Sequence, residues 1–233
     1  MIKAKHHSKG YSFVSERGHW LAVLLAVFIL VIHSQQFFPN GQGLIGHDYA
    51  YFLPYLLAGR YWAEINGYWS MPDAVAAFCG GMPWLANPQS MYFSLPQWLA
   101  FVFDPVTAVW LTYLLACAFG AVGVFVLCWR SFGTSAPAAV LAAVLFLLNG
   151  FLEARLAAGH LPYHALAVSP WIAHACLSLR VVGSGGRPLL GLLGAASLSA
   201  IGLAYLVYAG IPHFVLQTAW MLAAVFCLHA LRF

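Results

Sequence analysis

Charged residues are scarce in this chain, and hydrophobic residues dominate it. Asp, Glu, Lys and Arg together make up only 7% of the residues, and 63% are hydrophobic. A soluble globular domain carries roughly 25% charged residues, because charged side chains cover much of its water-facing surface. The composition therefore excludes an ordinary soluble domain and favours a protein embedded in a membrane.

A disulfide framework and a nucleic-acid surface are missing as well. Four of the five cysteines fall within apolar stretches, which leaves Cys79 without an exterior partner. The net charge of +4 comes with no basic patch interleaved with aromatic residues, so no nucleic-acid partner is expected. We assign the positive charge to membrane topology and to contact with anionic lipid headgroups.

What the sequence does contain is long charge-free intervals. A helix needs about 20 apolar residues to cross a hydrocarbon core of roughly 30 Å. The last interval, 188–231, is about twice that length, and Gly210-Ile211-Pro212 divides it. The predicted fold class is all-α, a polytopic transmembrane helix bundle that forms a single domain over residues 1–233. The predicted spans are about 19–38, 105–129, 135–152, 163–181, 188–208 and 212–231.

The distribution of charge predicts the orientation of this bundle. Lys and Arg are retained on the cytoplasmic side of short loops. Placing residues 1–18 in the cytoplasm leaves eight of the ten Lys and Arg inside and only Arg60 and Arg155 outside. The first span is too long for a signal peptide and is predicted to remain as an anchor. Five of the six acidic residues then lie outside, which suggests chemistry on the outer face.

The first exterior segment, 39–104, is too long for a plain connector. From Tyr49 to Asn66, hydrophobic residues recur at helical spacing and predict an amphipathic helix along the outer membrane interface. The stripe comprises Phe52, Leu53, Leu56, Leu57, Tyr61 and Ile65. Two glycines and two prolines in 78–89 predict an ordered, turn-rich loop, and Tyr92 to Phe103 is interpreted as a second interfacial or re-entrant piece. Together these parts are predicted to wall a cavity.

Three short segments carry a resemblance to a known family. They are Gly46-His47-Asp48-Tyr49, the Gly-Gly-Met-Pro-Trp-Leu-Ala-Asn-Pro-Gln run at 80–89, and the segment 148–162. In these segments the chain resembles bacterial members of the GT-C superfamily of membrane glycosyltransferases, which use lipid-phosphate-linked sugars as donors. The resemblance implies a multi-pass protein of the bacterial cytoplasmic (inner) membrane, with a polyprenyl-phosphate lipid as donor and membrane lipids around it.

The resemblance also implies roles for individual residues. Asp48 stands where the superfamily keeps an acidic residue, and inverting glycosyl transfer needs a carboxylate to take the acceptor's proton. The alternative is that Asp48 caps the helix that follows it. The substrate-binding candidates are His47, Asn87, Gln89, Glu153, Arg155 and His160.

Arg155 and Glu153 are placed on an exterior loop of about ten residues between the third and fourth spans. The guanidinium of Arg155 suits a lipid phosphate, because its donors match phosphate oxygens in pairs. The alternative is a Glu153–Arg155 ion pair without function. Asp104-Pro105 is interpreted as an N-cap followed by proline at the first helical position.

Histidines offer further alternatives. Five are predicted at the outer side, but His160 and His164 have a proline between them and no second acid or cysteine completes a metal spacing. We therefore assign no metal ligand and no cofactor, although a divalent metal remains an open alternative. His174 and His229 lie on apolar spans, where hydrogen bonding within the bundle is preferred over haem ligation.

Two functions follow as expectations. The first is transfer of a sugar from a polyprenyl-phosphate donor to an exterior acceptor. The second is a non-catalytic, GT-C-like structural subunit of a larger membrane complex, because the superfamily's core usually has more spans than the six predicted here. Another membrane subunit or a missing C-terminal portion is therefore expected as a partner.

Overall fold

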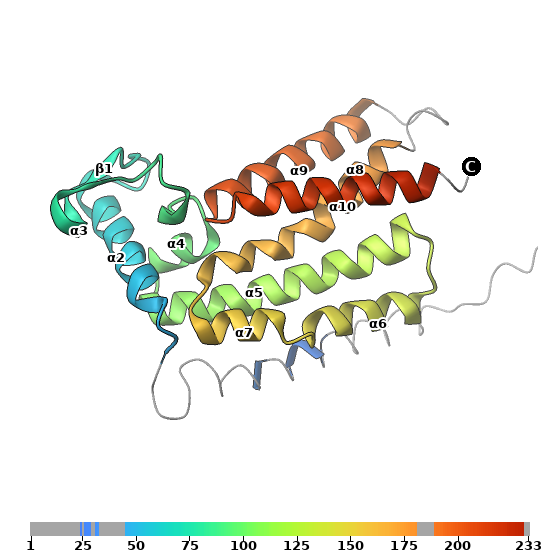
Figure 1. The fold of residues 1–233 in the computed structure, drawn as a ribbon, viewed down its shortest axis with the longest axis horizontal. Helices are drawn as coiled ribbons and strands as arrows, with labels where there is room; N and C mark the ends of the chain where they lie inside the picture. Colours follow the sequence, from blue (N-terminus) through green and yellow to red (C-terminus); the bar gives the residue numbers. More distant parts are fainter. Residues whose placement is uncertain (1–23, 25, 29–30, 33–44, 181–188, 231–233) are drawn as a thin grey trace, which may run out of the picture.

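A computed structural model describes residues 24, 26–28, 31–32, 45–180 and 189–230 of the chain (Figure 1). The structure is mostly helical, at 76%, and this part of the predicted fold class is confirmed. Its elements are α2 (Tyr49–Asn66), β1 (Ala74–Val75), α3 (Ala77–Gly80), β2 (Met82–Pro83), η1 (Pro88–Ser90), α4 (Leu95–Ala100), α5 (Pro105–Val126), η2 (Leu127–Ser131), α6 (Ala136–Leu147), α7 (Phe151–Ala158), η3 (Leu161–Val168), α8 (Ser169–Arg180), α9 (Leu189–Tyr208) and α10 (His213–Ala230).

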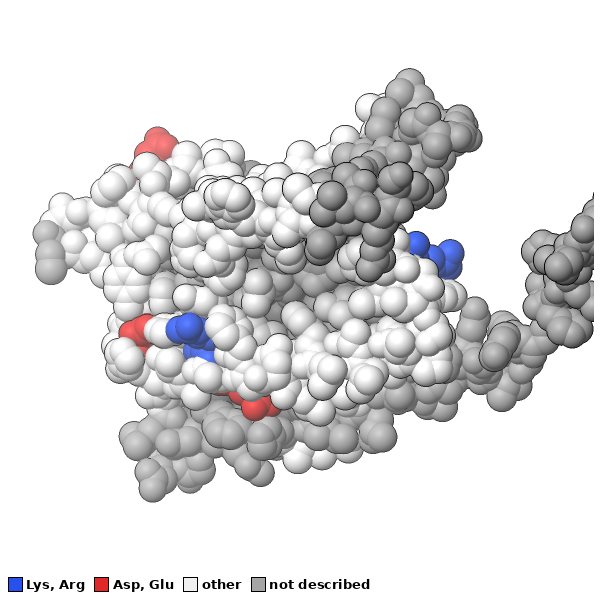
Figure 2. Space-filling view, turned by 45° about the vertical axis from the view of Figure 1, so that its right-hand side comes forward, with Lys and Arg blue, Asp and Glu red and all other residues white. Residues whose placement is uncertain are grey.

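The elements form a bundle and a headpiece. Helices α5, α6, α8, α9 and α10 run side by side along the long axis (Figure 1). The headpiece, residues 45–104, contains α2, α3, α4 and the two-stranded β1–β2 hairpin, and it covers one end of the bundle. The five described acidic residues lie in the headpiece or on α7. In Figure 2, the acidic side chains in view lie toward one end of the molecule, and basic side chains are seen at both ends.

Two helical stretches are long and apolar enough to cross a membrane. They are Pro105–Ser131, with 27 residues and a mean hydropathy of 2.3, and Ala136–Ala158, with 23 residues and a mean hydropathy of 1.8. Large apolar side chains such as Phe119, Leu141 and Leu145 are exposed on their outer faces, as a lipid environment permits. Helices also occupy the positions of the last three predicted spans. The predicted span 19–38 lies mostly outside the described residues.

Helix α5 is at the centre of the bundle because small residues let its neighbours approach closely. A Cβ on Gly120 would lie 2.5 Å from the Phe146 ring of α6, and a Cβ on Gly123 would lie 2.6 Å from Nε1 of Trp171 on α8. That indole Nε1–H donates a hydrogen bond to the carbonyl of Phe119 at 3.0 Å. Helix packing of this kind depends on glycine and alanine at the contact.

Helix α2 has the predicted bounds, and it buries part of the predicted stripe, Phe52 and Leu56. Leu57, Tyr61 and Ile65 are exposed, whereas the buried positions include two small ones, Gly59 and Ala63. A Cβ on Gly59 would lie only 2.3 Å from Oε1 of Gln97, so α2 and α4 meet at that glycine. A stripe of large hydrophobic residues does not reveal a contact that small residues make.

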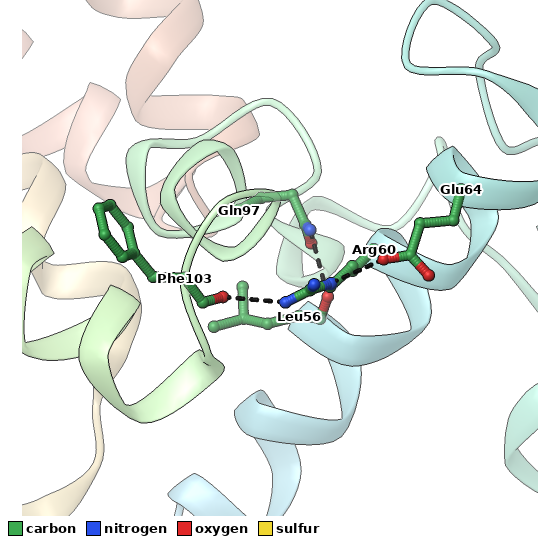
Figure 3. A network of polar contacts seen from close by, with 5 residues as sticks. All are labelled: Leu56, Arg60, Glu64, Gln97 and Phe103. Atoms are coloured by element: carbon green, nitrogen blue, oxygen red, sulfur yellow. Dashed lines mark hydrogen bonds and ion pairs between the residues drawn. The ribbon is translucent and has the colours of Figure 1, made fainter.

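Polar contacts fix α2 to the segment around α4 (Figure 3). The buried Gln97 amide donates a hydrogen bond to the carbonyl of Leu56 at 3.2 Å. Arg60 donates to Glu64 at 2.8 Å and to the carbonyl of Phe103 at 3.2 Å. The contacts with Gln97 and Phe103 attach the middle of α2 to the segment around α4.

The glycine- and proline-rich loop at 78–89 is ordered, as predicted. Ala74 pairs with Pro83 and Val75 with Met82 in the β1–β2 hairpin. Trp84 is fully buried in a cluster with Tyr55 and Tyr92. The loop therefore packs by its aromatic residues against the outer side of α2.

The predicted exterior loop between the third and fourth spans is instead largely helical. The turn after α6 has Gly150 at φ +72°, and the Asn149 side chain accepts a hydrogen bond from the backbone N–H of Phe151 at 2.7 Å. These two residues end one helix and start the next. The following Leu-Glu-Ala-Arg-Leu-Ala-Ala stretch consists of good helix formers, which explains why it forms α7.

Candidate functional site

Asp48 occupies the N-cap position of α2, but its side chain does not cap the helix. Its Oδ1 lies 2.8 Å from Nε2 of His47, and its Oδ2 lies 2.7 Å from Nε2 of His160. The capping interpretation is therefore wrong for this carboxylate. Both oxygens accept N–H groups, an arrangement that suits an ionised carboxylate.

Two glycines let the segment before α2 dock on the end of α7. A Cβ on Gly46 would lie 2.1 Å from the carbonyl oxygen of Ala157, and a Cβ on Gly159 would lie 2.6 Å from the backbone nitrogen of Tyr49. The N–H of Asp48 donates to the carbonyl of Ala158 at 3.3 Å. No side chain larger than hydrogen fits at either close approach.

The end of α7 also directs His160. Gly159 has φ +93°, its N–H donates to Leu156, and the N–H of His160 donates to Arg155 at 2.9 Å. These two bonds form the Schellman arrangement, which requires a left-handed residue such as glycine after the helix. The chain turns at Gly159, and His160 faces Asp48.

Tyr49 strengthens the same junction. Its side chain is fully buried, and its hydroxyl donates a hydrogen bond to the carbonyl of Leu156 at 2.7 Å. Burial raises the pKa of Tyr49 well above its usual range, so the hydroxyl stays protonated and keeps donating.

Arg155 is held beside His160 by one hydrogen bond and two aromatic rings. Its NH1 lies 2.9 Å from Nδ1 of His160. Its guanidinium carbon lies 5.0 Å from the Phe151 ring centroid and 4.5 Å from that of Tyr163, within the range of cation–π attraction. In the part of the chain that the structure describes, no carboxylate lies within ion-pair distance of this guanidinium.

The two contacts of His160 fix its tautomer. A guanidinium only donates, so Nδ1 of His160 must be the acceptor of the Arg155 hydrogen bond. The ring hydrogen is then on Nε2, where it is donated to Asp48. His160 is therefore a neutral imidazole between a cation and a carboxylate.

Glu153 and Arg155, which are both described, form no ion pair with each other. Because they lie two positions apart on a helix, their side chains point to different sides. The alternative interpretation of a local ion pair is therefore wrong, and the reason is that the segment is helical.

Two hollows lie near Asp48, which itself lines neither of them. The inner hollow has a cavity volume of about 20 Å³, and Arg155, His160 and Tyr49 line it together with apolar residues of α5. The outer hollow is open, with a volume of about 380 Å³, and Gly46, His47 and the first two turns of α2 line it. His160 lines the inner hollow and His47 lines the outer one, and Asp48 accepts a hydrogen bond from each of these histidines.

Asn87 and Gln89 are not brought into contact with this site. The side-chain oxygen Oδ1 of Asn87 accepts a hydrogen bond from the backbone N–H of Gln89 at 3.0 Å and so caps η1. The Gln89 side chain accepts a hydrogen bond from the hydroxyl of Tyr51 at 3.2 Å. Both residues hold the loop against α2, and their proposed contact with substrate remains a prediction.

The other histidines have separate surroundings. His164 is buried between the carbonyl of Leu161 and the hydroxyl of Tyr205, and His174 bonds Ser131, which confirms hydrogen bonding of His174 within the bundle. His33 and the side chain of His229 lie outside the described residues. Within the described ranges, no group of three or more His, Cys, Asp or Glu is arranged to hold a metal ion.

Sequence reasoning found Asp48, Arg155 and His160 but missed the residues that bring them together. Phe151 and Tyr163 cover the guanidinium, and Gly46 and Gly159 permit the docking. One signal was present in the sequence, because a glycine directly precedes a histidine in both Gly46-His47 and Gly159-His160.

Comparisons with known proteins assign no further residue to the site. No family model matches the chain, and no curated protein or solved structure matches it. What the site does must therefore be derived from its own residues and their geometry.

Proposed function

We propose that this chain is a membrane glycosyltransferase of the GT-C type, which transfers a sugar from a polyprenyl-phosphate donor to an acceptor outside the cytoplasmic membrane. The observation that carries the proposal is the position of the Asp48 carboxylate. It is not used to cap α2, it accepts N–H groups from His47 and His160, and these two imidazoles line separate hollows, the inner of which Arg155 also lines.

The chemistry of this group of residues suits glycosyl transfer from a phosphate. A carboxylate can support removal of the acceptor's proton while the acceptor oxygen attacks the sugar carbon. A guanidinium with N–H groups to spare stabilises the leaving phosphate. In the described part of the chain, Arg155 donates one side-chain hydrogen bond, so further donors are available to a phosphate.

The proposal also includes six spans, a cytoplasmic N-terminus and an exterior headpiece. It predicts that Trp69, which is 99% exposed in the headpiece, and Phe132, which is 52% exposed at the opposite end, lie on different sides of the membrane. We expect an impermeant maleimide to label Trp69→Cys in cells with a permeabilised outer envelope, in a background in which serine replaces Cys79 and Cys227. Phe132→Cys should react only after the membrane is disrupted, and the reverse pattern would contradict the orientation.

Arg155 provides a direct test of the phosphate role. Replacing it with alanine should raise the KM for a polyprenyl-phosphate sugar by roughly 10- to 100-fold, because hydrogen bonds to charged groups contribute about 1.5–3 kcal/mol. Arg155→Lys should restore only part of the affinity, since an ammonium lacks the paired donors. The measurement is transfer of labelled sugar in membrane vesicles. Arg60→Ala is the matched control, because Arg60 bonds Glu64 and Phe103 instead, and an equal rise in KM for that variant would contradict a specific role.

A second candidate is a non-catalytic subunit of a larger membrane complex. The small size of the inner hollow favours it, because its cavity volume of about 20 Å³ holds roughly one water molecule, far less than the volume of a ligand site. A sugar with its lipid phosphate needs more room, which a partner subunit would supply. Absence of transfer by the wild type with every donor tested, together with co-purification of another membrane protein, would favour this candidate.

A further inference from the structure

The hydrogen bonds of Asp48, His160 and Arg155 form a chain with a defined direction. Arg155 donates to Nδ1 of His160 at 2.9 Å, and Nε2–H of His160 donates to Asp48 at 2.7 Å. A carboxylate that holds one imidazole nitrogen orients the other nitrogen as a base and stabilises the imidazolium that forms. In His160 that second nitrogen is Nδ1, and it accepts a hydrogen bond from Arg155.

A carboxylate such as that of Asp48 is a weaker base than a neutral imidazole. Each oxygen of Asp48 lies within 2.8 Å of an imidazole nitrogen. The bond of Arg155 to Nδ1 has only one charged partner, because it joins a guanidinium to a neutral ring. A phosphate or sulfate offers the guanidinium a charge-assisted, bidentate partner, which is stronger.

We infer that His160 is the proton acceptor of the site. An anionic ligand binds Arg155, breaks its hydrogen bond to Nδ1 of His160, and so makes that nitrogen available. The identity of the reaction rests on the proposed function, whereas the exchange of Arg155 from His160 to an anion does not. Asp48 is then a positioning residue that holds Nε2–H of His160 and balances the charge of the imidazolium.

The step is balanced for glycosyl transfer. The acceptor oxygen forms a bond to the sugar carbon, and the bond from that carbon to the phosphate oxygen breaks with its electron pair. The acceptor's proton moves to Nδ1 of His160, and the phosphate leaves as an anion on Arg155. When the lipid phosphate departs, the proton is released to water and Arg155 returns to Nδ1.

The groups around His160 come from several elements. Asp48 and Arg155 bond it directly, and the Tyr163 ring lies 5.7 Å from the imidazole, centroid to centroid. His47 reaches it through Asp48, and His213 of α10 lies 6.4 Å from the Tyr163 ring. His47 and His213 are therefore the other imidazoles whose titration must be separated from that of His160.

The test uses sulfate, which does not titrate near neutral pH, and the purified full chain in detergent. Calorimetry in two buffers with different heats of ionisation measures the protons taken up with each sulfate. We expect net proton uptake at neutral pH, because loss of the Arg155 hydrogen bond and arrival of an anion both favour the imidazolium form of His160. Since the bound state holds more protons, affinity should fall by up to about tenfold per pH unit as pH rises.

His160→Gln should still bind sulfate but take up no proton, whereas His213→Gln should keep the uptake. If His160→Gln does not fold, His160→Asn replaces it, and the measurement on the wild type stands by itself. No sulfate binding, binding without proton uptake in the wild type, or unchanged uptake in His160→Gln would each overturn the inference. Proton uptake that persists in a protein without glycosyl transfer would reject the proposed function and keep the coupled anion site.

Discussion

Replacing Asp48 with asparagine is expected to lower sugar transfer by about 10²- to 10⁴-fold while the protein remains folded and inserted. Asparagine has nearly the size of aspartate, and it caps helices equally well. Its amide, however, carries no charge and turns a donor toward one of the two imidazole nitrogens that Asp48 accepts from. His160 then loses both its fixed tautomer and the counter-charge of its imidazolium. The measurement is transfer of labelled sugar from a polyprenyl-phosphate donor in vesicles, with protein level checked in parallel.

Asp104→Asn is the matched control for this substitution. Asp104 accepts the N–H groups of Val106 and Thr107, both at 3.0 Å, and so caps α5 as the sequence predicted. Hydrogen bonding to Thr107 lowers the pKa of Asp104, but asparagine can accept the same backbone donors. Transfer should therefore change little in Asp104→Asn. Turnover close to that of the wild type in Asp48→Asn would reject a role of this carboxylate in catalysis.

Much of the fold could be predicted because helices in an apolar chain have local signals. Helix α2 begins and ends where periodicity placed it, Tyr49 to Asn66. The Asp104-Pro105 pair marked the start of α5, and Gly210 with Pro212 separated α9 from α10. Each of these signals acts over a few residues, and the physical cause of each is contained in the sequence next to it.

The site depended on a contact that no local signal specifies. Gly46 and Asp48 meet the end of α7 more than a hundred positions later in the chain. A loop at 153–160 would allow Glu153 to pair with Arg155. In the structure this segment begins as helix α7, which separates the two side chains and directs Arg155 toward His160. A single error in secondary structure therefore changed the expected partner of the arginine. The carboxylate, the imidazole and the guanidinium were all identified, but their order in the hydrogen-bond chain was not.

Gly46→Ala is expected to separate Asp48 from His160 and to reduce transfer by about 10²-fold, since a displacement of 1 Å at a reacting group can have that effect. The new Cβ would lie 2.1 Å from the carbonyl oxygen of Ala157, so the segment must move away from α7. Because overpacking of this kind costs about 1–3 kcal/mol, the unfolding temperature in detergent should also fall.

The control for this prediction is Gly194→Ala on α9, where a Cβ would meet no atom within 4 Å. Alanine is favoured over glycine inside a helix by about 0.5–1 kcal/mol, so this variant should be unchanged or slightly more stable. The two variants add the same methyl group, and only the one at position 46 forces α7 and the start of α2 apart.

Sulfate calorimetry then separates loss of the site from loss of the fold, because a folded Gly46→Ala protein should bind sulfate at Arg155 with proton uptake that differs from that of the wild type. If Gly46→Ala keeps wild-type transfer and wild-type proton uptake, the close approach of Gly46 to α7 is not required for the site, and the assignment of Asp48 as the partner of His160 fails with it.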